Sequence, residues 1–187
     1  MSTTTEVTEL WLAFKKGDKE AFNRLASLFY QTLYSYGTKL TPDRGLVEDC
    51  IQDLFFELWQ RRTFLGATEH VKFYLLKALR RKIYHEKKTQ DKWNAQAVEA
   101  QDEQAFVGEF SVEKNIIDLE TSELHLKKLH HVLAKLSKRQ REIIYLKFYQ
   151  EMDYEQIANV MSINYQSVRN LLHTALRELK EAWVQEP

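Results

Sequence analysis

Side chains able to read nucleic-acid bases gather near the end of the chain, in DYEQIANVMSINYQSVRNLLHTALREL at residues 153–179. This run predicts a short helix, a turn of about four residues and a second helix, with the small Ala158 allowing a close crossing. In such a helix-turn-helix, the start of the second helix enters the major groove of DNA. Arginine matches the edge of guanine, and asparagine or glutamine that of adenine. The candidate base readers are Asn164, Gln166, Arg169 and Asn170. The alternative is an ordinary helical hairpin with a solvated polar face.

A second group of candidates lies on a basic helix expected at residues 70–88. Cations and aromatic rings alternate there, and they comprise Tyr74, Lys77, Arg80, Arg81, Lys82, Tyr84, His85, Lys87 and Lys88. Glu86 is the acidic residue among them. Such a mixture suits a strand whose bases are unstacked, because phosphates attract the charges and bases stack on the rings. A helix face that is simply solvated explains the same pattern.

A third group lies on the outer face of a helix expected at residues 43–60, where Asp49, Gln52, Asp53, Phe56 and Gln60 recur at steps of three and four. Phe56 stands opposite the apolar stripe of this helix. An exposed aromatic ring among acidic groups predicts a docking surface for a protein partner. Alternatively, Phe56 covers the end of a neighbouring helix.

Patterns typical of catalysis, metal binding and membrane insertion are absent. The chain has no phosphate-binding glycine loop, nucleophile elbow or zinc-protease motif, and its lone Cys50 falls on an apolar helix face. His130 and His131 are adjacent, so they point about 100° apart on a helix. No apolar run can span a bilayer, and the start of the chain is polar. We expect a soluble cytoplasmic protein without catalytic residues, metal or cofactor.

The elements that position these groups are predicted to be helices. With only 5 glycines and 2 prolines in 187 residues, folds rich in tight turns are disfavoured. Asp18 and Thr41 are expected N-caps, the latter with Pro42 in the first helical turn. Capping boxes are expected at Ser137 with Gln140 and at Asp153 with Gln156. The apolar positions expected to face inward include Phe73, Leu76, Leu79, Ile83, Ile143, Ile144, Leu146 and Phe148.

The charge pattern divides the chain into three parts. Basic and acidic side chains balance at 27 each, but residues 1–90 hold 15 basic and 11 acidic groups, residues 91–120 hold 2 and 8, and residues 121–187 hold 10 and 8. An acidic segment between two mildly basic ones is typical of a connector between modules. The prediction is an all-α protein of two helical domains, residues 1–90 and 121–187, joined by an acidic linker at 91–120.

These features, in this order, resemble the extracytoplasmic-function (ECF) sigma factors of bacterial RNA polymerase. EAFNRLASLFYQTLYSYGTKLTPDRGLVEDCIQDLFFELWQRR is similar to the start of sigma region 2, and LSKRQREIIYLKFYQEMDYEQIANVMSINYQSVRNLLHTALREL to region 4. The words MDYEQIA and NYQSVRNLLH resemble the sigma factors of Bacteroidota. Ser162 stands where the family often has a turn glycine, so that turn must avoid positive φ or tolerate strain.

The resemblance implies a function for each group of residues. Contact with the β′ coiled coil of core RNA polymerase is assigned to Asp49, Gln52, Asp53 and Phe56. Capture and melting of the minus-10 element is assigned to Phe64, Tyr74, Lys77, Arg80, Arg81 and Tyr84. Recognition of the minus-35 duplex is assigned to Asn164, Tyr165, Gln166, Ser167, Arg169, Asn170 and His173. Further implied partners are the polymerase β flap, promoter DNA and a membrane-bound anti-sigma factor.

Two other classes of function remain open from the residues alone. A stand-alone helix-turn-helix regulator would use its N-terminal helices to dimerise or to sense a ligand, and would bind a palindromic duplex without polymerase. A helical adaptor would bind only proteins. Co-purification with core RNA polymerase separates both from a sigma factor.

Overall fold

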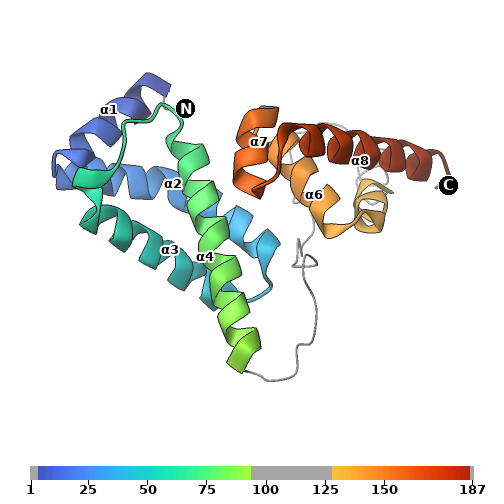
Figure 1. Cartoon of the computed structure of the whole chain (residues 1–187), viewed down its shortest axis with the longest axis horizontal. Coiled ribbons are helices and arrows are strands. Elements are labelled where there is room, and N and C mark those ends of the chain that lie inside the picture. Colours follow the sequence, from blue (N-terminus) through green and yellow to red (C-terminus); the bar gives the residue numbers. More distant parts are fainter. Residues whose placement is uncertain (1–3, 94–127, 186–187) are drawn as a thin grey trace, which may run out of the picture. The chain divides into compact units, whose positions relative to one another are not determined.

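The computed structural model describes residues 4–93 and 128–185, and these residues confirm the all-α prediction. Neither described stretch contains a β-strand. The chain forms two compact units, residues 1–101 and 102–187, and Figure 1 labels helices α1–α4 in the first and α6–α8 in the second. Each unit is described below by itself.

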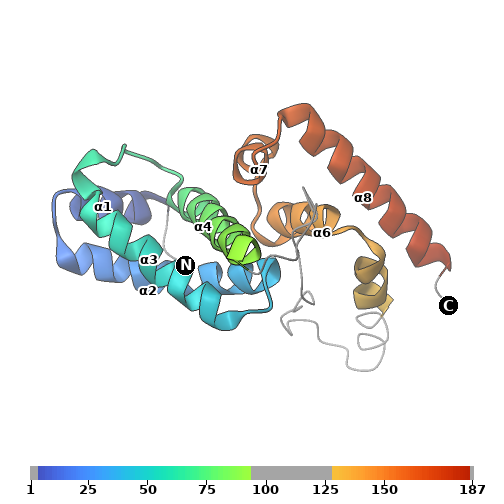
Figure 2. The same ribbon diagram turned by 60° about the horizontal axis from the view of Figure 1, so that its bottom comes forward.

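Four long helices form the N-terminal unit. They are α1 (Thr4–Lys15), α2 (Lys19–Leu40), α3 (Arg44–Gln60) and α4 (Val71–Trp93), with a short 3₁₀ helix, η1 (Arg62–Phe64), after α3. The long α2 packs against each of the other three α-helices, and α3 also packs against α4 (Figure 2). The segment that links η1 to α4 is hydrogen-bonded to α1, because the indole N–H of Trp11 donates to the carbonyl of Gly66.

Side chains that cap the backbone set the starts of α2 and α3. Asp18 accepts hydrogen bonds from the N–H groups of Glu20 and Ala21, as predicted, and the preceding Gly17 has a φ of 96°. The prediction of Thr41 as an N-cap is wrong. Thr41 is buried and ends α2, because its N–H donates to the carbonyl of Gly37. The N-cap of α3 is Asp43, whose carboxylate accepts from the N–H of Leu46, so Pro42 lies outside the helix.

The core of the N-terminal unit is apolar and draws on all four helices. Its most buried large side chains are Trp11, Phe14, Leu33, Tyr36, Leu40, Ile51, Leu75, Leu76, Leu79 and Ile83. Cys50 is buried among them, which fits its prediction as a core residue. Phe73, expected to point inward, is only half-buried, because Val71 and Leu75 occupy the inner face of this part of α4.

The C-terminal unit begins, among the described residues, with a helical stretch at 128–135. It continues with α6 (Lys138–Ile144), a π-helical turn, η2 (Tyr145–Tyr149), then α7 (Tyr154–Met161) and α8 (Tyr165–Gln185). Both predicted capping boxes are present, at Ser137 with Gln140 and at Asp153 with Gln156. Packing of α8 against α6 and α7 closes the unit.

Two expectations about the middle of the chain need correction. Phe148 was expected to face inward, but it is exposed, because the wider π-helical turn after Ile144 shifts the register. The helix α4 continues to Trp93, into the segment expected to be the acidic linker. The rest of that segment, residues 94–120, lies outside the described residues.

Candidate functional site

The predicted helix-turn-helix comprises α7, a three-residue turn and α8. Ala158 is buried on α7, and the capping N–H of Ser162 donates to the carbonyls of Ala158 and Asn159. Ser162 adopts a left-handed conformation, with a φ of 55° and a ψ of 45°. Because this region disfavours a residue with a Cβ, the turn accepts strain where a glycine would be relaxed.

One face of α8 is buried and the opposite face is exposed. The buried side chains Val168, Leu172 and Ala175 follow each other at helical spacing. On the opposite side, Gln166, Arg169, Asn170 and His173 are all exposed. The spacing of three, one and three residues places these four side chains along one stripe. The stripe starts in the first turn of α8, where a recognition helix contacts bases.

Local hydrogen bonds organise the start of α8. Asn164 acts as its N-cap, because its Oδ1 accepts from the N–H of Ser167 at 2.7 Å. Gln166 donates through Nε2 to Oδ1 of Asn170 at 2.9 Å, so these two amides are paired. The oxygens of Asn164 and Asn170 therefore have partners within the protein.

The sequence did not single out Tyr154, the first residue of α7, or Lys147 in η2 before it. The ring of Tyr154 lies edge-on to that of Tyr165, with 5.8 Å between their centres. Lys147 Nζ lies 5.1 Å from the centre of the Tyr154 ring. A cation and two aromatic rings thus adjoin the first turns of α7 and α8. The motif pattern could not indicate Lys147, because it comes from the π-helical turn before α7.

In the N-terminal unit, α4 presents a basic and aromatic face. Tyr74, Lys77, Arg81 and Tyr84 recur at steps of three and four residues, and Lys77 and Arg81 are exposed. Arg80 lies beside this stripe, with its guanidinium carbon 4.5 Å from the centre of the Tyr84 ring. The alternation of charge and ring expected from the sequence therefore lies on one surface.

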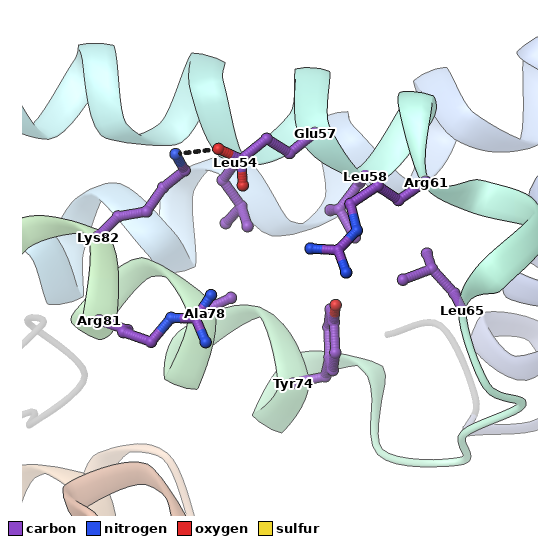
Figure 3. A pocket seen from close by; sticks show the side chains of 9 residues that line it. All are labelled: Leu54, Glu57, Leu58, Arg61, Leu65, Tyr74, Ala78, Arg81 and Lys82. Atoms are coloured by element: carbon purple, nitrogen blue, oxygen red, sulfur yellow. Dashed lines mark hydrogen bonds and ion pairs between the residues drawn. The ribbon is translucent and has the colours of Figure 1, made fainter.

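A small pocket lies between α3 and this face of α4. It is lined by Leu54, Glu57, Leu58, Arg61, Leu65, Tyr74, Ala78, Arg81 and Lys82. Figure 3 shows Arg61 from the end of α3 and Tyr74 from α4 pointing toward one another across it. Arg61 was not among the predicted site residues, because it lies in the expected loop and joins the others only through the packing of the two helices.

The loop between α3 and α4 displays Phe64, which is 86% exposed. This exposure leaves the Phe64 ring accessible from the solvent. Phe64 is the last residue of η1, and residues 65–70 connect it to α4, which carries Tyr74, so these two minus-10 candidates belong to consecutive segments.

The residues predicted to lie on the outer face of α3 are exposed, as the sequence indicated. Asp49, Gln52, Asp53, Phe56 and Gln60 are all exposed, and Phe56 is 61% exposed. That exposure does not fit the alternative in which the ring covers a neighbouring helix end. The surface therefore carries an unpartnered aromatic ring surrounded by carboxylates and amides.

The described residues thus hold three separate surfaces, two on the N-terminal unit and one on the C-terminal unit. Within the described ranges, no group of three or more metal-ligating side chains occurs. No helix among the same residues is long and apolar enough to cross a bilayer.

Comparison with known proteins assigns both units. Residues 25–92 match the family model "Sigma-70 region 2", and residues 126–179 match "Sigma-70, region 4". The chain is 24% identical over 182 residues to the ECF RNA polymerase sigma factor SigK of Mycobacterium sp. (strain JLS), which covers 95% of this chain and 90% of the relative. The same identity and coverage hold for SigK of Mycobacterium sp. (strain KMS).

Two solved structures share the fold. The sigma factor RpoE from Bartonella quintana, solved with the anti-sigma factor NepR, has a TM-score of 0.62 at 19% identity and covers 89% of this chain and 98% of its own. CnrH, solved with the cytosolic domain of CnrY, has a TM-score of 0.59 at 17% identity, with coverages of 96% and 98%.

Regions 2 and 4 in this order define a class of protein, the sigma-70 transcription initiation factors. Within that class the chain belongs to the ECF sigma factors, which bind core RNA polymerase and direct transcription initiation at specific promoters.

Proposed function

We propose that this sigma factor divides promoter recognition between its two units and catalyses no reaction itself. The observation that carries the proposal is the presence, in one chain, of two exposed faces whose side chains suit two different forms of nucleic acid. The face of α4 alternates cations and rings, which suits a melted strand. The stripe on α8 carries side chains that each have two hydrogen-bonding groups, and such side chains suit base edges in the major groove.

For the minus-10 element, we assign the unstacked bases to the exposed Phe64 ring and the half-buried rings of Tyr74 and Tyr84, and the phosphates to the neighbouring cations. The assigned residues are Phe64, Tyr74, Lys77, Arg80, Arg81 and Tyr84. For the minus-35 duplex, the assigned residues are Asn164, Tyr165, Gln166, Ser167, Arg169, Asn170 and His173. The hydrogen bonds of Asn164 and Asn170 favour a supporting role for those two oxygens, which leaves Arg169 as the principal base reader.

The outer face of α3 is assigned to core polymerase. Asp49, Gln52, Asp53 and Phe56 would contact the β′ coiled coil, with Phe56 as the apolar anchor among polar groups. Region 4 would contact the β flap. Because the structural neighbours were solved with an anti-sigma factor or a partner's cytosolic domain, we also propose an anti-sigma partner that covers the polymerase-binding surfaces.

The domain limits predicted from the sequence are kept as a proposal, although α4 crosses the first of them. Residues 1–90 would form region 2, residues 91–120 the acidic linker and residues 121–187 region 4. The helix α4 extends the ordered part of the first domain to Trp93. The words MDYEQIA and NYQSVRNLLH support a Bacteroidota-like origin, and the proposed function supports a cytoplasmic location.

Runoff transcription tests the proposal. Core polymerase from a Bacteroidota species, with and without the purified chain, is given genomic fragments, and the promoters are mapped by the ends of the transcripts. Transcripts that depend on the chain and share two conserved elements are expected. Binding of a palindromic duplex by the chain alone, with no transcription on addition of core enzyme, would instead support a stand-alone regulator.

A further inference from the structure

The loop that displays Phe64 is anchored on both sides of this residue. Before it, Arg62 donates through Nη1 to the carbonyl of Trp59 at 2.8 Å, and the Arg62 guanidinium lies 4.6 Å from the centre of the Trp59 ring. After it, the carbonyl of Gly66 accepts from the indole N–H of Trp11 at 3.0 Å. Phe64, whose ring is the most exposed aromatic ring among the described residues, therefore lies between two anchored residues of the loop.

The second anchor comes from α1, a helix outside the segment that matches region 2. That match begins at residue 25, whereas Trp11 lies in α1 and is only 2% exposed. The Trp11 ring lies edge-on to Tyr74, with 5.5 Å between their centres, and edge-on to Phe14 at 5.4 Å. One buried indole thus contacts both the backbone of the loop and an aromatic side chain of α4.

These contacts have a consequence for binding. A loop that must become ordered on binding loses affinity, whereas a loop already held in its bound shape does not. Stacking of a base on an exposed ring also depends on the position of that ring relative to its neighbours. Trp11 sets the position of Phe64 through Gly66 and that of Tyr74 through direct ring contact.

We propose that Trp11 and Arg62 are positioning residues for minus-10 recognition. They hold the loop so that Phe64 and Tyr74 together present a stacking surface to unstacked bases of the melted strand. The helix α1 thereby takes part in base discrimination without contacting DNA. This inference rests on the proposed assignment of Phe64 and Tyr74 to the minus-10 element.

The test uses holoenzyme assembled from core polymerase and the full chain. Its affinity is measured for a fluorescent single-stranded oligonucleotide carrying the cognate minus-10 element and for one with that element scrambled. Trp11→Phe keeps a buried ring but removes the N–H donor. Loss of one such hydrogen bond predicts about 2- to 10-fold weaker binding of the cognate strand. Binding of the scrambled strand should be unchanged, so the discrimination ratio falls.

A purely structural role for Trp11 would give a different result. Fewer folded molecules would lower the binding capacity for both strands equally and leave the ratio of affinities unchanged. Hydrogen exchange of the amides at residues 63–67 should also accelerate in Trp11→Phe. Trp183→Phe makes the same chemical change on α8, in the other unit, and should match the wild type in both measurements.

A second variant keeps the inference testable if Trp11→Phe does not fold. Arg62→Lys retains the charge but loses the planar group that lies over Trp59, and it should lower the same ratio. An unchanged ratio in the folded variants, with Phe64→Ala impaired, would overturn the positioning role and leave the minus-10 assignment intact. No loss of cognate binding in Phe64→Ala would overturn the assignment itself.

Discussion

Lys82 on α4 donates to Oε1 of Glu57 on α3 at 2.7 Å, and its Nζ lies 3.8 Å from Oδ2 of Asp53. The dashed line in Figure 3 marks the first contact. The side chain of Lys82 is 18% exposed, whereas those of Glu57 and Asp53 are 53% and 69% exposed. Two carboxylates of α3 therefore neutralise part of the basic charge of α4. In the sequence, Glu86 is the acidic residue among these basic side chains, so the contribution of α3 was not expected. We expect Lys82 to contribute less to phosphate binding than Arg81.

Phe56→Ala should weaken binding to core polymerase while region 2 stays folded. Burying this ring at an interface is worth about 1.5 to 3 kcal/mol, and a ring that is exposed in the free protein adds little to stability. Affinity for core enzyme and the thermal midpoint are measured together. Leu54→Ala is the matched control on the same helix: Leu54 is 3% exposed, so truncation should cost about 2 to 5 kcal/mol of folding stability. A large stability loss in Phe56→Ala with affinity retained would show that the ring belongs to the core.

Replacing Arg80 and Arg81 by Gln should impair promoter opening more than recruitment. Their charges are assigned to the backbone of a strand that exists only after melting, so they act late. Permanganate footprints on a duplex promoter should shrink, and a pre-melted template should restore part of the transcription. Lys19→Gln removes an exposed charge at the start of α2, outside the proposed DNA-binding face, and serves as the control. Footprints of normal extent in the double variant would leave these arginines as a solvated face.

Arg169→Ala should change which minus-35 sequence supports transcription. Loss of one paired base contact costs about 1 to 3 kcal/mol at a single position, whereas loss of a phosphate contact weakens all sequences alike. Arg177→Ala is the control, because Arg177 lies two turns later on α8, with Nε 4.0 Å from Glu181. Activity is compared over a set of single-base minus-35 variants. A uniform decrease for Arg169→Ala would mean that this residue contacts the backbone instead.

Three helix starts were predicted correctly because a side chain caps backbone N–H groups a few residues further along the chain. Asp18, Ser137 and Asp153 act through neighbours within three residues, so their roles can be read without knowing the fold. The prediction for Thr41 was wrong because two residues able to cap a helix flank Pro42, and Asp43 rather than Thr41 accepts from the N–H of Leu46. Phe148 failed because a π-helical turn changes the helical period locally, and no spacing rule for an α-helix anticipates this.

The exposed faces of α3, α4 and α8 were predictable for the same reason, since helical spacing alone decides which side chains share a face. The support of the loop between α3 and α4 could not be predicted from helical spacing. The hydrogen bond from Trp11 to Gly66 joins residues 55 positions apart, and the position of Arg61 beside Tyr74 depends on how α3 packs against α4. Such relationships arise only when distant elements meet.

Gly37→Ala should destabilise the N-terminal unit at the crossing of α2 and α3. A Cβ at this position would lie 2.5 Å from Cγ1 of Val47, which is closer than packed atoms allow. Overpacking of this kind costs about 1 to 3 kcal/mol, measured by urea unfolding. Adding Val47→Ala should return part of the loss, because it removes the clashing methyl groups. Gly66→Ala is the neutral control, since a Cβ there meets nothing within 4 Å. Equal stability of Gly37→Ala and wild type would contradict the close crossing.

The thiol of Cys50 should be unreactive in the folded protein. Burial, with a smaller effect from the Glu86 carboxylate, raises the pKa of Cys50 from 9.0 to about 11. Because the thiolate is the nucleophile, iodoacetamide at pH 8 should label the unfolded chain but not the native one. The native state holds its proton more tightly than the unfolded state, so this group's contribution to stability is complete below pH 9 and is lost as the pH rises toward 11.

The pH dependence is isolated by comparing wild type with Cys50→Ala. Tyrosine and lysine side chains also titrate above pH 9, but they are common to both proteins, so their effects cancel in the difference between the two free energies of unfolding. That difference should be constant from pH 7 to about 8.5 and should then decline for wild type relative to the variant. A difference in free energy of unfolding that stays flat to pH 11 would show that the thiol ionises as it does in water. Rapid labelling of native protein at pH 8 would show that the core between α2, α3 and α4 opens far more readily than its packing implies.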